Sequence, residues 1–201
     1  MREHQSDMKN PIKVLTGLLL VAGLLLLAGC VVTSVYPYFT AKDVVVDELL
    51  VGKWADPDDA AEPEKYWQFA RTNGQAYSLV IHDGEESQGY LVHLFKLKGR
   101  RFIDAEPTAR KDDLIPPHYL LQVHRLDASG LTLSIMDYKW LEKLVERDPS
   151  AIEHLWVDRN VVENKPGRVI LTANTPKLQK LILKYAGDTN AFSELDQMLR
   201  K

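Results

Sequence analysis

Three histidines lie in stretches that alternate between apolar and polar residues, and they are the first candidates for chemistry. His93 shares its side of the pattern with Leu91 and Phe95, which favours a core or rim position. His118 and His124 share one side of a later stretch whose other side is apolar, so we expect both to face solvent. A zinc site needs three or four converging ligands, and no short His or Cys pair has the usual spacing. The sequence therefore predicts no metal site and no cofactor.

Carboxylates and serines give no further catalytic pattern. The acidic segment from Asp56 to Glu64 lacks the central glycine of a calcium loop and contains prolines, so we expect a solvated hairpin loop. Neither a Gly-x-Ser-x-Gly elbow nor a phosphate-binding glycine loop is present. We therefore predict no catalytic residues and a protein that is not an enzyme. A hydrolase that uses the histidines is the remaining enzymatic alternative.

The only cysteine, Cys30, follows an uncharged run from Val14 to Gly29 that is rich in Leu, Val and Ala. Basic residues precede the run and small residues end it, as in a secretory signal peptide. The sequence Leu27-Ala28-Gly29-Cys30 resembles the lipobox of bacterial lipoproteins of uncharacterised type. This resemblance implies cleavage between Gly29 and Cys30, a diacylglyceryl group on the Cys30 thiol, and a further acyl chain such as palmitate on the new amine. The alternative is an uncleaved anchor, since roughly 20 apolar residues can span a bilayer.

The lipobox resemblance also implies a location and a partner. In such lipoproteins from bacteria with two membranes, Asp after the lipidated Cys often marks retention in the inner membrane. Here the residue is Val31. We therefore expect a lipid-anchored protein of the cell envelope, on the periplasmic face of the outer membrane if the host has two membranes. Membrane lipid is the expected partner of the acylated N-terminus.

Composition and length limit the remaining possibilities. The full chain of 201 residues has a formal net charge of -3, so it has no basic surplus that would favour nucleic-acid binding. We predict a signal peptide over residues 1–29, a lipidated Cys and tether over 30–47, and one globular domain over 48–201. The aromatic cluster at 36–39 is expected to pack either at the membrane interface or against the domain. A chain that begins near Thr40 is therefore expected to fold.

From residue 50 to residue 137, apolar residues recur with a period of two between turn residues. Strands are predicted for YWQFA, AYSLVI, GYLVHLFKLKG, RFIDAE, HYLLQVHRL and LTLSIMD. Asn73-Gly74 predicts a two-residue hairpin turn, and Asp83-Gly84, Gly99 and residues 127–130 predict later turns. Consecutive strands joined by short turns should pair antiparallel.

After residue 137 the period changes to that of a helix. YKWLEKLVERD predicts a helix with Asp137 as its N-cap, and Asp148-Pro149 predicts a short helix to about Leu155. RVILTA predicts a late strand, and Thr175-Pro176 predicts the start of another helix. A final amphipathic segment contains Phe192, Leu195, Met198 and Leu199. We therefore expect a helix-rich block with one late strand over residues 138–201.

These elements predict an α+β fold, in which an antiparallel meander of about seven or eight strands forms a barrel or half-barrel with C-terminal helices. At the first strand, Gly52-Lys53-Trp54 is similar to the Gly-x-Trp signature of the lipocalins, whose Trp plugs the closed end of the barrel. The resemblance implies a lipocalin-like barrel. The sequence departs from that family in two ways. It has no Thr-Asp-Tyr-like motif, and no basic residue follows the expected last strand, where the family usually stacks one on the Trp.

The combined pattern predicts a membrane-anchored binding or interaction domain. A barrel cavity lined by Tyr77, Leu79, His93 and Phe95 would bind a small apolar or amphipathic ligand. The alternative is a scaffold or accessory subunit that binds an envelope protein complex through the C-terminal block. Trp54 is expected to be buried near one end of the sheet. One shared core is predicted for Trp67, Phe69, Tyr77, Leu79, Leu121, Leu133 and Ile135.

Overall fold

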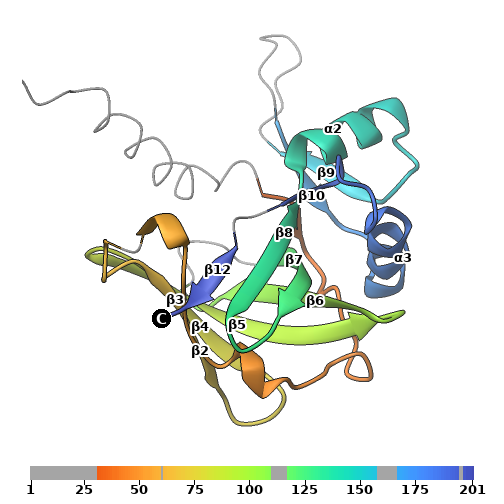
Figure 1. Ribbon diagram of the computed structural model, residues 1–201. Helices are drawn as coiled ribbons and strands as arrows, with labels where there is room; N and C mark the ends of the chain where they lie inside the picture. Colours follow the sequence, from red (N-terminus) through yellow and green to blue (C-terminus); the bar gives the residue numbers. More distant parts are fainter. Residues whose placement is uncertain (1–30, 60, 110–116, 158–166, 195–196) are drawn as a thin grey trace, which may run out of the picture. The chain divides into compact units, whose positions relative to one another are not determined.

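Eight antiparallel strands close into a barrel in the computed structural model, which describes residues 31–201 except residues 60, 110–116, 158–166 and 195–196 (Figure 1). The strands of the ring are β2 (Gly52–Ala55), β3 (Tyr66–Arg71), β4 (Tyr77–Asp83), β5 (Glu86–Leu97), β6 (Arg100–Pro107), β7 (His118–Leu126), β8 (Gly130–Met136) and β12 (Met198–Arg200). The short C-terminal strand β12 pairs antiparallel with both β8 and β2 and so closes the ring. The predicted barrel is confirmed.

Strands β3 to β8 form the predicted meander, each antiparallel to the next. The first hairpin differs in its turn. The ladder between β3 and β4 ends at the pair Arg71 and Tyr77, so the loop has five residues instead of two. Gly74 in this loop has φ +101°, a conformation that favours glycine. The Asn-Gly signal therefore located the hairpin correctly but not its length.

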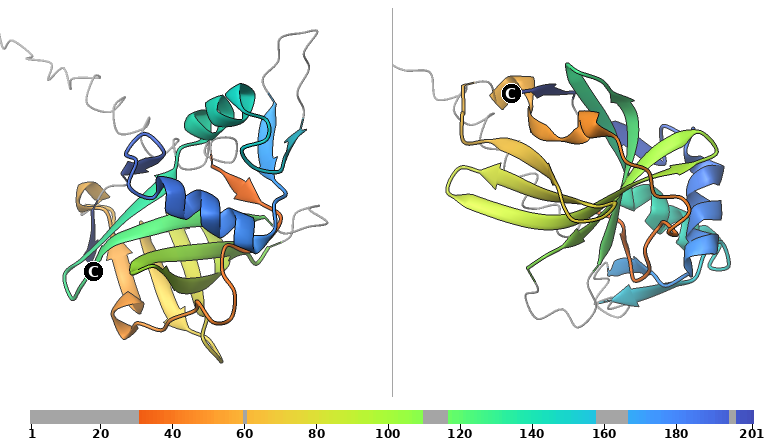
Figure 2. Two further views of the ribbon diagram at one scale, coloured as in Figure 1. Left: turned by 90° about the vertical axis from the view of Figure 1, so that its right-hand side faces the viewer. Right: turned by 90° about the horizontal axis from the view of Figure 1, so that it is seen from below.

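In the described part of the chain, two α-helices pack against the outside of the barrel. Helix α2 (Tyr138–Arg147) begins where predicted, because the Asp137 carboxylate accepts a 2.6 Å hydrogen bond from the Trp140 N–H. Helix α3 (Thr175–Tyr185) is capped by Asn174, one residue earlier than the predicted start, and lies across the barrel wall (Figure 2). Two single turns of 3-10 helix, η2 (Glu48–Leu50) and η3 (Pro57–Asp59), flank β2.

The C-terminal block contains more strands than predicted. The short helix expected after Pro149 is absent, and β9 (His154–Val157) instead pairs antiparallel with β10 (Arg168–Leu171). The last amphipathic segment forms β11 (Phe192–Glu194) and β12. The expectation of one late strand in residues 138–201 is therefore wrong, whereas two of the expected helices, α2 and α3, are present. The physical reason is that these short strands find their partners far away in the sequence, so the local periodicity does not reveal them.

Residues 31–47 belong to the folded body and do not form a tether. Strand β1 (Thr33–Ser34) pairs antiparallel with β7 and parallel with β10. Val32 and Tyr38 are buried, with exposed fractions of 1% and 0%. The Tyr38 N–H donates to the Asp104 carboxylate at 2.8 Å, and the Thr175 hydroxyl donates to the Pro37 carbonyl at 2.7 Å. This segment is clamped between the barrel wall and α3, because it bonds to both.

The apolar side chains form two clusters, one on each face of the barrel wall. The outer cluster joins the helices and the N-terminal segment to side chains of β5, β6 and β7, including Phe95, Phe102 and Leu120. The inner cluster fills the barrel and contains Leu50, Trp54, Phe69, Tyr77, Leu79, Val92, Leu94, Ile103, Ala105, Leu121, Val123, Leu126, Leu131, Leu133 and Met198. The predicted burial of Trp54 is confirmed. Most of the predicted core is also confirmed, although Trp67 and Ile135 are only half-buried.

Candidate functional site at the open end of the barrel

The interior side chains of the barrel become more exposed toward one end. Along β4, Tyr77 and Leu79 are buried whereas Ile81 is half-buried. Along β8, which runs the same way, Leu133 is fully buried whereas Ile135 is half-buried. Interior residues of β3, β5 and β7 show the same gradient, ending at Trp67, Tyr90 and Tyr119. One end of the barrel interior is therefore closed, and the other, which we call the open end, carries half-buried side chains among the described residues.

Trp54 plugs the closed end. Its side chain is fully buried, and the indole N–H donates a 2.9 Å hydrogen bond to the carbonyl of Leu50 in η2. The preceding backbone is bonded to the wall, because the Asp47 N–H donates to the Tyr77 hydroxyl at 2.8 Å and that hydroxyl donates to the Asp47 carbonyl at 3.2 Å. These contacts close this end with backbone and aromatic side chains.

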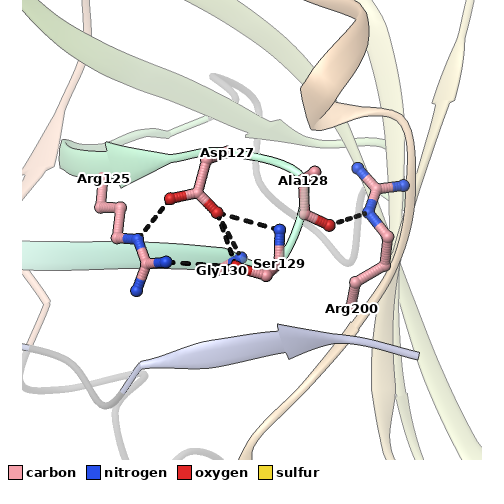
Figure 3. A network of polar contacts seen from close by, with 6 residues as sticks. All are labelled: Arg125, Asp127, Ala128, Ser129, Gly130 and Arg200. Atoms are coloured by element: carbon pink, nitrogen blue, oxygen red, sulfur yellow. Dashed lines mark hydrogen bonds and ion pairs between the residues drawn. The ribbon is translucent and has the colours of Figure 1, made fainter.

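Arg200 in β12 stacks on Trp54 at the closed end, its guanidinium carbon 4.5 Å from the ring centroid. Its N–H groups donate to the carbonyls of Leu49, Val51 and Ala128; Figure 3 shows the bond to Ala128, in the turn between β7 and β8. The expectation that no basic residue stacks on the Trp is therefore wrong. It assumed that the strand at RVILTA was the last one, whereas the last strand is β12.

Gly52 makes room for this arginine. A Cβ atom at position 52 would lie 2.7 Å from a guanidinium nitrogen of Arg200, and the residue has φ +137°. Both the space and the backbone conformation favour glycine. The two residues of the Gly-x-Trp signature thus act together at the closed end. Trp54 lies inside the barrel, and Gly52 leaves space for the Arg200 guanidinium that stacks on Trp54.

The open end is lined by apolar and aromatic side chains, which we call the mouth residues: Trp67, Ile81, Tyr90, Tyr119 and Ile135. Tyr90 and Tyr119 meet edge to face with ring centroids 6.2 Å apart. Burial, reinforced by Tyr119, raises the pKa of Tyr90 to about 12, so its hydroxyl stays neutral at physiological pH. Such a lining can bind apolar or amphipathic molecules.

The four predicted cavity residues do not line one cavity. Tyr77 and Leu79 lie deep inside the barrel, in the inner cluster. His93 and Phe95 lie on the opposite face of β5, where Phe95 belongs to the outer cluster and the ring of His93 stacks on Phe39 with centroids 4.3 Å apart. The interior positions of β5 are Val92 and Leu94 instead. The prediction chose the wrong face of β5 because helices and the N-terminal segment also bury its outer face.

The mouth residues were not predicted as a site, because strand pairing, and not local periodicity alone, brings them together. Ile81 continues the predicted alternation of Tyr77 and Leu79, so its face could be read from the sequence. Tyr90 joins this face only through its pairing with Leu79, and Tyr119 through its pairing with Ala105. Register between strands, which the local pattern does not contain, brings these side chains together.

His118 is buried and does not face solvent as predicted. Its Nδ1 lies 2.8 Å from the Asp104 carboxylate, and both side chains lie under the N-terminal segment. Burial lowers the pKa of His118, but the hydrogen bond and charge of Asp104 outweigh this effect and raise it. For the neighbouring His93, burial lowers the pKa despite the nearby carboxylates.

The exposed His124 contacts a serine, but the pair does not form an accessible nucleophile. Its Nε2 lies 2.6 Å from the Ser134 hydroxyl, and Ser134 is only 1% exposed. Among the described residues, no group of three His, Cys, Asp or Glu side chains could hold a metal ion. The predicted acidic loop between β2 and β3 is present and contains η3.

Two shallow hollows lie outside the barrel. One, of about 460 Å³, lies between the C-terminal end of α2, residues 148–153 and one face of α3, and the other, of about 470 Å³, lies beside α3 and Lys98. Lysines line much of both, and Lys177 is paired with Glu153. Neither hollow reaches the inner cluster of the barrel.

The predicted lipobox, its cleavage point and the lipidated Cys30 lie outside the described residues and stay predictions. Within the described part of the chain, no helix has both the length and the apolar character needed to cross a membrane.

Comparison of the chain with protein-family models, curated proteins and solved structures finds no match.

Proposed function

We propose that this chain is a membrane-anchored bacterial lipoprotein without enzymatic activity, whose barrel binds a small apolar or amphipathic molecule at its mouth. The observation that carries the proposal is the exposure gradient along the barrel interior, from fully buried Tyr77 to half-buried Ile81. An eight-stranded barrel has an interior just wide enough to be filled by side chains or to hold one small ligand. The deeply buried floor and the half-buried mouth support a ligand held near the open end.

We further propose that the barrel is of the lipocalin-like type. Gly52, Trp54 and Arg200 support this, because a basic residue of the last strand stacks on the Trp of the first barrel strand. The order of eight antiparallel strands around the ring is also that of an up-and-down barrel. Among the described residues, the additional strands β1, β9, β10 and β11 and the helices α2 and α3 distinguish this chain from a plain barrel.

Labelled palmitate tests the anchor. Cells that express the wild-type chain should incorporate the label, and the mature N-terminus should be Cys30. The variant Cys30→Ser should take up no label and remain uncleaved, because the thiol that carries the lipid is gone. An unlabelled wild-type protein would contradict the anchor without affecting the barrel.

Native mass spectrometry tests the binding site on the lipidated protein after mild extraction from membranes. The wild-type protein should retain a small-molecule adduct. Ile81→Asn should reduce that retention roughly tenfold or more, because it places an uncharged polar group among apolar mouth residues. Leu155→Asn, at a residue of β9 that is 60% exposed, is the matched control and should retain the adduct. An empty wild-type protein, or equal retention in Ile81→Asn, would contradict the proposal.

A second candidate function is that of a scaffold or accessory subunit of an envelope complex. Leu155 on β9 favours it, because this large apolar side chain is 60% exposed on a strand at the end of the described sheet order. A photo-crosslinking residue at position 155 in intact cells should then capture one stable protein partner. Capture of no partner would contradict this candidate.

A further inference from the structure

Two acidic loops flank the mouth. The loop between β2 and β3 and the turn between β4 and β5 join strand ends next to Trp67 and Ile81. Trp67 and Ile81 pair across β3 and β4, so both loops lie at the open end. The carboxylates of the two loops belong to Asp56, Asp58, Asp59, Glu62, Glu64, Asp83, Glu85 and Glu86.

The negative charge of these loops is only partly compensated. Burial raises the pKa of the Asp59 carboxyl, and Lys65 opposes the rise. Neighbouring carboxylates add to it, including that of Asp83 in the other loop. In the described part of the chain, the ammonium groups that contact the β2–β3 loop are those of Lys65 and Lys201. Among the described residues, these two loops therefore contribute net negative charge beside the mouth.

The aromatic side chains of the mouth also favour a positively charged ligand. Trp67, Tyr90 and Tyr119 contribute three rings to the open end. Aromatic faces attract cations through their quadrupole, and quaternary ammonium groups are recognised in this way. This argument depends on ring chemistry and is independent of the carboxylates.

We propose that the mouth takes a positively charged amphiphile, with an apolar chain and an ammonium or quaternary ammonium head. The chain packs against the mouth residues, and the head lies between the aromatic rings and the acidic loops. An anionic amphiphile of equal chain length is repelled by the same carboxylates. The inference rests on the proposed function, because it specifies the ligand class for the same mouth.

The charge preference should be moderate and sensitive to salt. Most of these carboxylates are exposed, so their interaction with a ligand is weakened by water. We expect a cationic ligand to bind roughly 3- to 30-fold more tightly than a neutral one at low ionic strength. The Debye length is about 8 Å at physiological ionic strength and about 3 Å at 1 M, so high salt should remove most of the difference.

Equilibrium dialysis with three eight-carbon probes tests the inference. The lipidated full-length protein is placed in discs of zwitterionic lipid, and empty discs correct for partition into the bilayer. Radiolabelled octyltrimethylammonium should bind more tightly than octanol, and octanol more tightly than octyl sulfate. The three affinities should converge when salt is raised.

Two double variants complete the test. Glu85→Gln with Glu86→Gln removes two charges at the mouth. It should lower the ratio of octyltrimethylammonium affinity to octanol affinity several-fold, while the octanol affinity itself stays unchanged. Glu48→Gln with Glu142→Gln removes two charges elsewhere and should leave the preference intact. The inference is wrong if octanol binds but octyltrimethylammonium binds no more tightly than octanol. It is also wrong if the variant Glu85→Gln with Glu86→Gln still prefers the cationic probe as strongly as the wild type does. In both cases the proposed function stands. If none of the three probes binds, the proposed function itself is wrong.

Discussion

At the scale of single residues, Arg200 joins parts of the chain that are far apart in sequence. Its guanidinium contacts the Trp54 ring, and its donors reach carbonyls of η2 and of the turn between β7 and β8. An exposed ion pair contributes little because water competes for each charge. Arg200 differs because a planar group with several fixed donors satisfies carbonyls at once and also stacks on an aromatic ring. We therefore expect it to matter more than its exposure suggests.

Arg200→Ala should lower the free energy of unfolding by about 1–3 kcal/mol, since it removes both the hydrogen bonds and the ring contact. Urea denaturation followed by tryptophan fluorescence measures this. Arg200→Lys should recover only part of the loss, because an ammonium group lacks the planar fork. Lys180→Ala, at an exposed position on α3, is the control and should change stability by less than about 0.5 kcal/mol. Equal stability of Arg200→Ala and wild type would refute this role.

His118 should make stability depend on pH. Its pKa in the folded state is raised above the ordinary value of 6.5 by Asp104, so protonation favours the folded state. This contribution is complete below about pH 6.5 and is lost as the pH rises through the raised pKa. The difference in unfolding free energy between wild type and His118→Gln should therefore be larger at pH 6 than at pH 8.5. A difference that is constant or that grows with pH would contradict the ion pair with Asp104.

At the scale of elements, a strand is predicted well from the sequence when its pairing partner is close along the chain, and poorly when that partner is far away. Strands β3 to β8 alternate clearly and pair with their sequence neighbours, so turns and periodicity locate them. Strand β12 has three residues, and its pairing with Trp54 and Ala55 links the two ends of the barrel sequence. Leu195, Met198 and Leu199 have helix-like spacing, yet β12 forms because β2 and β8 offer open edges. Such strands are selected by tertiary pairing, which a local pattern does not contain.

Removal of Met198 to Lys201 should open the barrel between β2 and β8. The truncated chain loses the buried Met198 side chain, the contacts of Arg200 and the backbone bonds of β12, which together contribute about 4–6 kcal/mol. Two unpaired edges would then promote aggregation. Hydrogen exchange of β2 and sedimentation velocity measure these effects, with Lys201→Ala as the control that retains β12. A truncated chain that stays monomeric with protected β2 amides would show that β12 is not needed for closure.

At the scale of the whole molecule, the barrel and the helical layer depend on the segment that was expected to be a tether. The sequence predicted a tether over residues 30–47, because the segment has a few aromatics, one proline and a short acidic stretch. Its partners are instead the outer face of β7, the Asp104 carboxylate and α3. The candidate site also depends on pairing between separate parts of the chain. The mouth forms because the ring closes and because the register of five strands brings its side chains together. Both features required knowledge of long-range pairing.

A chain that begins near Thr40 lacks part of the segment that covers the barrel wall. Such a chain loses Val32 and Tyr38 from the outer cluster, and each buried side chain of this kind contributes about 1.5–3 kcal/mol. It also removes the N–H donor to Asp104 and uncovers the ion pair with His118. A chain beginning at Val31 keeps all of these contacts. We therefore expect the chain from Thr40 to unfold at a lower urea concentration than the chain from Val31, by roughly 5 kcal/mol in free energy. Equal urea midpoints would show that this segment covers the barrel wall without stabilising it.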